Sequence, residues 1–168
     1  FHQLDAVTKL VADTRAQGPG KRYLIQHSAG SGKTRTIAWT AHRLATLHRP
    51  DDSKVFDSVI VVTDRKVLDD QLQDAIKQIE PTQGIVQNIN QREAARYFAQ
   101  MADEKKSKSN LLRHTLTDGK MILVVTIQTF PFILKAISEN AELRDRNFAI
   151  IADEAHSSQT GGSSKKLR

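Results

Sequence analysis

The sequence predicts an α/β protein with a mostly parallel sheet and helices on both faces. Short runs rich in β-branched residues, such as SVIVVT at 58–63 and MILVVTI at 121–127, have the apolar character of strands buried on both faces. Amphipathic segments separate these runs. A glycine-rich stretch follows an earlier apolar run, YLIQH at 23–27. Strands that alternate with helices in this way are joined in parallel by right-handed crossovers.

The first part of the chain predicts a helix, a strand, a loop and a second helix. Residues 1–17 place Leu4, Val7 and Val11 on one helical face, and the GPG turn ends this helix. The apolar run YLIQH at 23–27 predicts a short strand. The next helix carries an apolar stripe, which consists of Ile37, Ala41, Leu44 and Ala45, and it ends near Pro50.

The remainder of the chain repeats the alternation. The expected elements are a strand at 58–63, a helix over 65–80, a weaker strand at 84–89, a helix over 91–106, a strand at 121–127, a helix over 130–140 and a strand at 148–155. Residues 157–168 have the small polar composition of a mobile loop. The length of 168 residues suits one domain. Because the chain starts at Phe1 and ends in KKLR, we expect this domain to be part of a longer polypeptide.

The composition favours a polyanionic partner without naming one. The net charge is +6, and the stretch from Lys33 to Arg49 has four Lys or Arg and no acid. A nucleic-acid track and a solvated basic face both explain this pattern. The absence of cysteine excludes disulfides and cysteine-based zinc sites. No apolar run approaches the ~20 residues of a membrane span, so we expect a cytoplasmic protein without a membrane partner.

The stretch HSAGSGKT, residues 27–34, resembles the phosphate-binding template G-x-x-x-x-G-K-[ST] and lacks only its first glycine. Gly30 and Gly32 let backbone N–H groups converge on phosphate oxygens at the start of a helix. Lys33 reaches the β- and γ-phosphates, and the Thr34 hydroxyl is a ligand for Mg²⁺. The alternative is a Gly/Ser-rich turn with an incidental lysine.

Two carboxylates end the apolar run FAIIADEAH. Asp153 and Glu154 are expected at the carboxyl edge of the sheet, where such sheets bind ligands. Asp153 suits the coordination of Mg²⁺, and Glu154 suits the orientation and deprotonation of a water. An acid pair alone fits a solvated strand end equally well. Together with the phosphate-binding motif, it predicts phosphoryl transfer from a nucleotide to water.

The motifs GSGKT and DEAH resemble those of the first motor domain, a RecA-like P-loop NTPase lobe, of superfamily 2 helicases and translocases. The stretches VVTDRKVLDDQ, TIQTF and DEAHSSQTG are similar to the motor (R) subunit of type I restriction-modification enzymes. This resemblance covers nearly the whole chain and implies an ATP-dependent translocase of double-stranded DNA. It also implies modification and specificity subunits, and a second motor lobe of the same chain, as partners.

The resemblance assigns roles to further residues. Gln3 would read adenine, although a polar residue at a helix start explains it nearly as well. His156 would couple the nucleotide site to its neighbours. The remaining positions are the nucleotide-binding loop residues Ala29, Gly30, Ser31 and Gly32, and the DNA-facing residues Thr63, Asp64, Arg65, Thr126 and Gln128.

Two departures from the family pattern limit the expected activity. The sequence stops before the Ser/Thr-Ala-Thr type motif, so the lobe is expected to be incomplete at its C-terminal end, and the second lobe with its arginine finger is absent. We therefore expect little hydrolysis. PDDSK at 50–54 fuses Pro-Asp and Asp-x-Lys without the gap that the family's nuclease needs, so no DNA-cleaving site is expected. The alternatives are a helicase or remodelling ATPase from another superfamily 2 branch, and a nucleotide-gated DNA-binding module without turnover.

Overall fold

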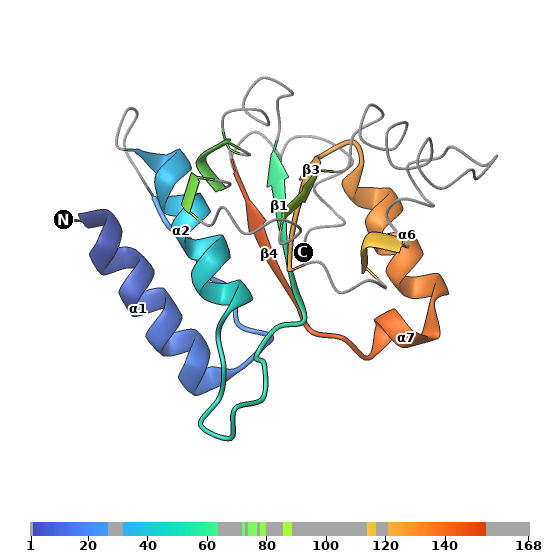
Figure 1. Cartoon of the computed structure of the whole chain (residues 1–168), viewed down its shortest axis with the longest axis horizontal. Coiled ribbons are helices and arrows are strands. Elements are labelled where there is room, and N and C mark those ends of the chain that lie inside the picture. Colours follow the sequence, from blue (N-terminus) through green and yellow to red (C-terminus); the bar gives the residue numbers. More distant parts are fainter. Residues whose placement is uncertain are drawn as a thin grey trace.

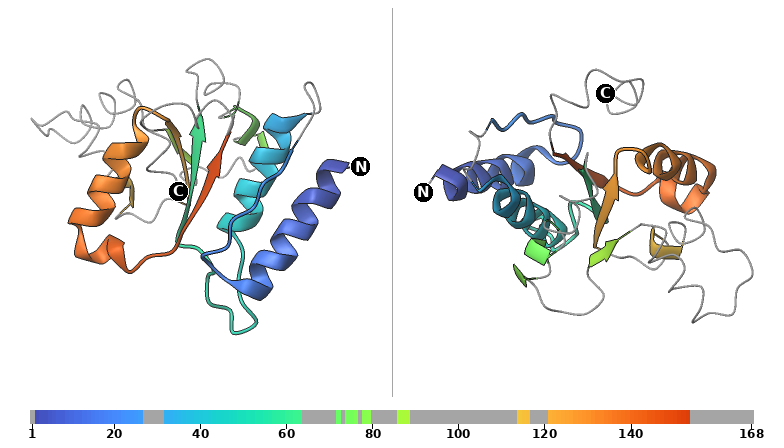
Figure 2. Two further views of the ribbon diagram at one scale, coloured as in Figure 1. Left: turned by 180° about the vertical axis from the view of Figure 1, so that it is seen from behind. Right: turned by 90° about the horizontal axis from the view of Figure 1, so that it is seen from above.

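The computed structural model describes residues 2–26, 32–63, 72, 74–76, 78–79, 86–88, 114–116 and 121–153. These residues form three layers, with a central sheet between two groups of helices (Figure 1). Figure 2 shows the same layers from behind and from above. The predicted α/β class with a parallel sheet and helices on both faces is confirmed.

The described sheet has four parallel strands in the order β2-β3-β1-β4. Their bounds are β1 Ser58–Thr63, β2 Val86–Asn88, β3 Ile122–Thr126 and β4 Phe148–Ala152. The strand at the centre, β1, pairs with β3 from Val59↔Ile122 to Thr63↔Thr126, and with β4 from Ser58↔Phe148 to Val62↔Ala152. Since all strands run the same way, their carboxyl ends share one edge.

Helices cover both faces of this sheet. The helices α1 (His2–Gln17) and α2 (Lys33–Ala45) lie side by side on one face, and α6 (Phe130–Glu139) and α7 (Ala141–Arg144) lie on the other (Figures 1 and 2). No described helix has the length and apolar character needed to cross a membrane.

The two-residue period of β1 explains why two separate cores form. Val59 and Val61 pack into the cluster beneath α1 and α2, whereas Ile60 and Val62 pack into the cluster beneath α6 and α7. All six residues of β1 are buried. The strand predicted at 58–63 is therefore confirmed at both of its bounds.

The strand predicted at 23–27 is wrong over its described part. Residues 21–26 are irregular and exposed, and Leu24 is 86% exposed. A strand requires a hydrogen-bonded neighbour, and no described strand pairs with this segment. Side-chain contacts to α1 hold it instead, as described below.

The face assignment of α1 also needs one correction. Val7, Val11 and Thr14 are buried, as a helical stripe requires, but Leu4 is 59% exposed. Leu4 lies in the first turn of the helix, one turn before the stripe that packs on α2 begins.

Other predicted elements are confirmed only in part. Residues 72, 74–76 and 78–79 are helical, inside the helix expected over 65–80, and β2 lies inside the weaker strand expected at 84–89. The helix expected over 91–106 and the mobile loop at 157–168 lie outside the described residues.

Candidate functional site

The glycine before α2 has a backbone conformation that few other residues adopt. Gly32 is the N-cap of α2, with φ 77° and ψ 30° in the left-handed region. No side-chain hydrogen bond caps the N-terminus of this helix. The N–H of Thr36 donates to the Gly32 carbonyl at 3.2 Å, which closes the first turn. The N–H groups of a first turn lie outside the helix's own ladder of hydrogen bonds, and the helix dipole favours an anion there.

Lys33 and Asp153, which are distant in the sequence, meet at this helix start. The Nζ of Lys33 lies 3.3 Å from Oδ1 of Asp153. The lysine side chain is 39% exposed, whereas the aspartate side chain is only 9% exposed. A carboxylate with so little solvent requires a nearby cation, and Lys33 supplies that positive charge.

The sheet explains how Asp153 reaches this position. Its N–H donates to the carbonyl of Val62 at 2.9 Å, so the pairing of β1 with β4 continues past the last residue of β4. Asp153 is thereby fixed at the carboxyl edge of the sheet. The placement predicted from the sequence agrees with this geometry.

Gln3 lies against the same glycine. A Cβ built on Gly32 would stand 2.5 Å from Nε2 of Gln3, which is closer than real Cβ atoms approach. The absence of a side chain at position 32 therefore lets the first turn of α1 approach the start of α2. The sequence gives no periodic signal for this contact, because it joins two helices.

The remaining predicted nucleotide-site residues are described only in part. Thr34 is the second residue of α2 and is half-buried, next to Lys33. The residues that lie outside the described part of the chain are Ala29, Gly30, Ser31, Glu154 and His156. Their predicted roles stay predictions.

Two of the predicted DNA-facing residues end neighbouring strands. Thr63 and Thr126 are register partners at the carboxyl ends of β1 and β3. Thr63 is fully buried, and its hydroxyl donates to the Val125 carbonyl at 3.5 Å, so the structure gives it a packing role. The Thr126 hydroxyl lies 3.1 Å from that of Thr129, in the turn before α6.

Gln128 is exposed in the turn between β3 and α6, at the same edge of the sheet. Asp64 and Arg65 lie outside the described residues. Thr129 was not predicted as a site residue, although the Thr-x-x-Thr spacing of TIQT is a signal for such a hydroxyl pair across a turn.

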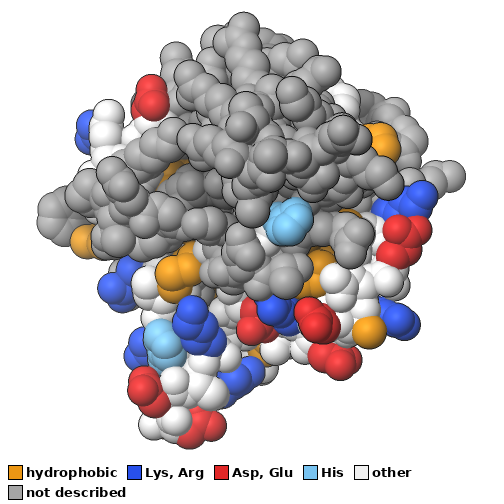
Figure 3. All heavy atoms as spheres, turned by 45° about the vertical axis from the view of Figure 1, so that its right-hand side comes forward, with side chains coloured by type: hydrophobic (Ala, Val, Ile, Leu, Met, Phe, Trp, Pro, Cys, Tyr) orange, Lys and Arg blue, Asp and Glu red, His pale blue; other side chains and the backbone are white. Residues whose placement is uncertain are grey.

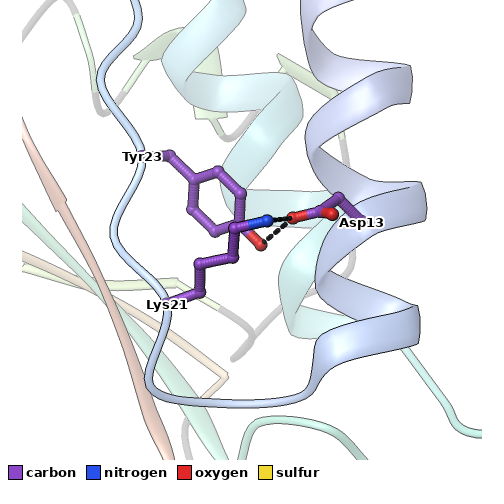
Figure 4. A network of polar contacts seen from close by, with 3 residues as sticks. All are labelled: Asp13, Lys21 and Tyr23. Carbon is purple, nitrogen blue, oxygen red and sulfur yellow. Dashed lines mark hydrogen bonds and ion pairs between the residues drawn. The ribbon is translucent and has the colours of Figure 1, made fainter.

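A second polar cluster holds the segment before the glycine-rich bend. The carboxylate of Asp13 accepts hydrogen bonds from Lys21 Nζ at 2.6 Å and from the Tyr23 hydroxyl at 2.7 Å (Figure 4). The Lys21 ammonium also lies 5.5 Å from the centre of the Tyr23 ring. These contacts tie residues 21–23 to the C-terminal half of α1.

The same contacts shift the titration of two groups. The hydrogen bond from Lys21, and then that from Tyr23, lower the pKa of Asp13 below its ordinary value, and the hydrogen bond to Asp13 raises the pKa of Lys21.

An open groove of about 430 Å³ runs beside this cluster; its lining residues are Ala6, Lys9, Leu10, Asp13, Tyr23, Leu24, Ile25 and Gln26. None of the lining residues in the described part of the chain is a predicted nucleotide-site residue.

The fold and the site together define a class of protein. A parallel α/β lobe carries a lysine at the start of a helix after a glycine-rich bend, and an aspartate from a strand end lies against that lysine. This combination is typical of nucleotide-hydrolysing P-loop domains.

The chain belongs to the SWI2/SNF2 ATPase family, whose family model matches residues 2–168. The family makes it a helicase-like ATPase of superfamily 2, and it implies the use of a nucleotide. Searches of the curated proteins and of the solved structures gave no match.

Proposed function

We propose that this chain is the ATP-binding lobe of a DNA translocase, of the kind found in the motor subunit of type I restriction enzymes. The observation that carries the proposal is the 3.3 Å approach of Lys33 Nζ to Asp153 Oδ1 at the carboxyl edge of the sheet. This pair stands where the fold class binds its ligands, and the family supports the use of ATP.

The residues at this edge divide the work of binding ATP. Lys33 and the backbone at the start of α2 hold phosphate oxygens, and Gln3 reads the base beside Gly32. Thr34 and Asp153 would hold Mg²⁺, which neutralises charge on the phosphates when it is bound. The donor set fits this ion, because the Asp153 carboxylate has little solvent and already pairs with a cation. Glu154 orients and deprotonates the attacking water.

Double-stranded DNA is the proposed substrate of the motor. Thr126 and Gln128 lie at the carboxyl edge, where they would contact the DNA backbone together with Asp64 and Arg65. Neutral side chains in such positions set register on a duplex without reading its sequence. The proposed partners are a second motor lobe and the modification and specificity subunits of a restriction complex, in the cytoplasm.

The family match supports a second candidate within the same class. A remodelling ATPase of another superfamily 2 branch would use the same nucleotide site, and the matched family is described as SWI2/SNF2 rather than as a restriction enzyme. The two candidates differ in partners. Stimulation of ATP turnover by duplex DNA only when modification and specificity subunits are present would favour the restriction enzyme.

The nucleotide site is tested by thermal unfolding with and without Mg-ATP. A ligand that binds the folded state stabilises it by RT ln(1 + [L]/Kd), so wild-type protein should melt at a higher temperature with ATP. Lys33→Ala should remove this shift, because it removes the ammonium that faces the phosphates. Lys9→Ala, which deletes an exposed lysine of α1, is the control and should keep the shift. An equal shift in Lys33→Ala would refute the proposed site.

A further inference from the structure

The outer face of α2 carries three exposed side chains at successive four-residue intervals. These are Arg35, Trp39 and Arg43, and Trp39 is 38% exposed. Four residues advance an α-helix by about 6 Å and slightly more than one full turn, so the three side chains form one stripe. The other face of α2 is buried, with Ile37, Ala41 and Leu44 in the core.

The charges of this stripe have no partners within the described part of the chain. Neither guanidinium makes an ion pair or a hydrogen bond there, and the Trp39 indole makes none. The exposed lysines of other helices differ, since Lys9 pairs with Asp5 on α1 and Lys135 with Glu139 on α6. Acidic and basic side chains also lie intermixed on the face in Figure 3.

The sequence of α2 explains the excess of positive charge. No acid occurs between Lys33 and Arg49, so α2 lacks the intrahelical partners that would neutralise its arginines. Tryptophan and arginine are the residue types most enriched among the side chains that dominate protein–protein binding. An unpaired arginine one turn before and one turn after a half-exposed tryptophan therefore has the composition of an interface.

We propose that Arg35, Trp39 and Arg43 form a docking surface for an acidic segment of a partner protein. In this complex an apolar side chain of the partner covers Trp39, and carboxylates one helical turn away on either side pair with the two arginines. The guanidinium group favours such two-pronged contacts with carboxylates. Charge complementarity identifies the partner as acidic, and the exposed indole requires an apolar group at its centre.

Duplex DNA fits the stripe less well than a protein does. Two arginines about 12 Å apart are sparse against a duplex that carries one charge per about 1.7 Å of its axis. The bases of a duplex are stacked inside it, so a phosphate backbone would leave the apolar surface of Trp39 without a partner. The residues proposed to contact DNA lie instead at the carboxyl edge of the sheet, beyond β1 and β3.

The single tryptophan of the chain makes this surface directly measurable, because all of its tryptophan fluorescence comes from Trp39. The probe is an alanine-based helical peptide with Glu, Leu and Glu at positions i, i+4 and i+8. We expect saturable binding with a blue shift of the emission, since the leucine removes water from the indole. A peptide with lysines in place of both glutamates should not bind.

Charge reversal localises the contact. Arg43 lies more than two helical turns from Lys33. The Arg43→Glu variant should weaken peptide binding at least about tenfold, because its carboxylate repels the glutamates of the peptide. Arg35→Glu should act in the same direction. Arg15→Glu and Arg144→Glu reverse exposed arginines on α1 and α7, and should leave the affinity unchanged. An unchanged far-UV circular dichroism spectrum and a cooperative thermal transition without ligand show that each variant is folded.

Three outcomes would overturn the docking proposal. The first is no saturable change with the acidic peptide, and the second is an equal loss of affinity in the Arg15→Glu or Arg144→Glu control. The third is tighter binding of a single-stranded oligothymidylate than of the peptide, because the stripe would then be a stacking platform for nucleic acid. None of these outcomes depends on the nucleotide site, so the two proposals fail separately.

Discussion

Gly32 is the residue whose backbone and neighbours most tightly constrain the proposed nucleotide site. Its left-handed conformation begins α2, and Gln3 occupies the space that a side chain would need. Gly18 has nearly the same φ, at 75°, but a Cβ there would meet nothing within 4 Å. The two glycines are therefore a matched pair that separates backbone strain from the contact with Gln3.

We predict that Gly32→Ala and Gly18→Ala lower the free energy of unfolding by similar amounts, about 1 kcal/mol, because a left-handed alanine is strained and Gln3 is flexible enough to move away. Only Gly32→Ala should weaken ATP binding, since it displaces Gln3 and alters the start of α2. Urea unfolding and nucleotide titration measure the two effects. Equal ATP affinity in both variants would contradict the role given to Gly32 and Gln3.

The role of a residue in the site was predictable where a sequence motif fixes the chemistry of that position. The phosphate-binding motif identified Lys33, and the acidic strand end identified Asp153; the structure brings the two together. The cluster of Asp13, Lys21 and Tyr23 was not predictable, because hydrogen bonds between side chains across a turn leave no periodic pattern. The same holds for the contact of Gln3 with Gly32.

At the scale of elements, the segment from Lys21 to Gln26 differs most from its prediction. Apolar composition predicted a strand at 23–27, but composition does not reveal whether a neighbouring strand is present to pair with it. The apolar runs at 58–63 and 148–155 also predicted strands, and both do have such neighbours. The first forms β1, and the second forms β4, which ends at Ala152. The segment 21–26 is held by side-chain hydrogen bonds to α1 instead of by backbone hydrogen bonds to a neighbouring strand.

The contacts of Lys21 and Tyr23 with Asp13 tether residues 21–26 to α1, and this tether should depend on pH. The pKa of Asp13 is lowered, so its contribution is present above its ordinary value of 3.8 and is lost as the pH falls through the lower value of the folded state. The pKa of Lys21 is raised, so its contribution is present below 10.5 and is lost as the pH rises through the higher value of the folded state. The tether is therefore intact across the neutral range.

NMR shifts of the Tyr23 ring measure this dependence. We predict constant shifts at neutral pH and a transition below pH 3.8. Asp13→Asn should remove the transition and reduce the hydrogen-exchange protection of residues 21–26. Asp5→Asn, which breaks the pair with Lys9 on the same helix, should change neither. A Tyr23 ring that does not respond to Asp13→Asn would exclude the tether.

At the scale of the whole molecule, the layered architecture positions the chemistry. The four strands that the structure describes end at one edge, and α2 starts there, so residues distant in the sequence converge. The alternation of apolar runs and amphipathic segments was sufficient to predict this arrangement. The strand order β2-β3-β1-β4 was not predictable from periodicity, because it depends on which crossovers pack on which face.

The net charge of +6 leads to a prediction for DNA binding by the whole molecule. Each phosphate neutralised by a lysine or arginine contributes about −0.9 to the slope of log affinity against log salt. If a basic track binds duplex DNA, the slope should be roughly −3 or steeper. Gln128→Ala should lower the affinity without changing the slope, since the amide is neutral. A flat salt response would favour a solvated basic face.

The most direct test of the account is whether Asp153 and Lys33 share one Mg-nucleotide. Calorimetric titration with ATP, with Mg²⁺ and with a chelator, measures the gain in affinity that the metal provides. We predict a clear gain for wild type, and for Asp153→Asn little gain but tighter metal-free binding, because a carboxylate next to the phosphates is removed. Asp145→Asn, at the end of α7 on the other face of the sheet, is the control for a lost charge. If Asp153→Asn retained the full gain from Mg²⁺, the central claim would be wrong.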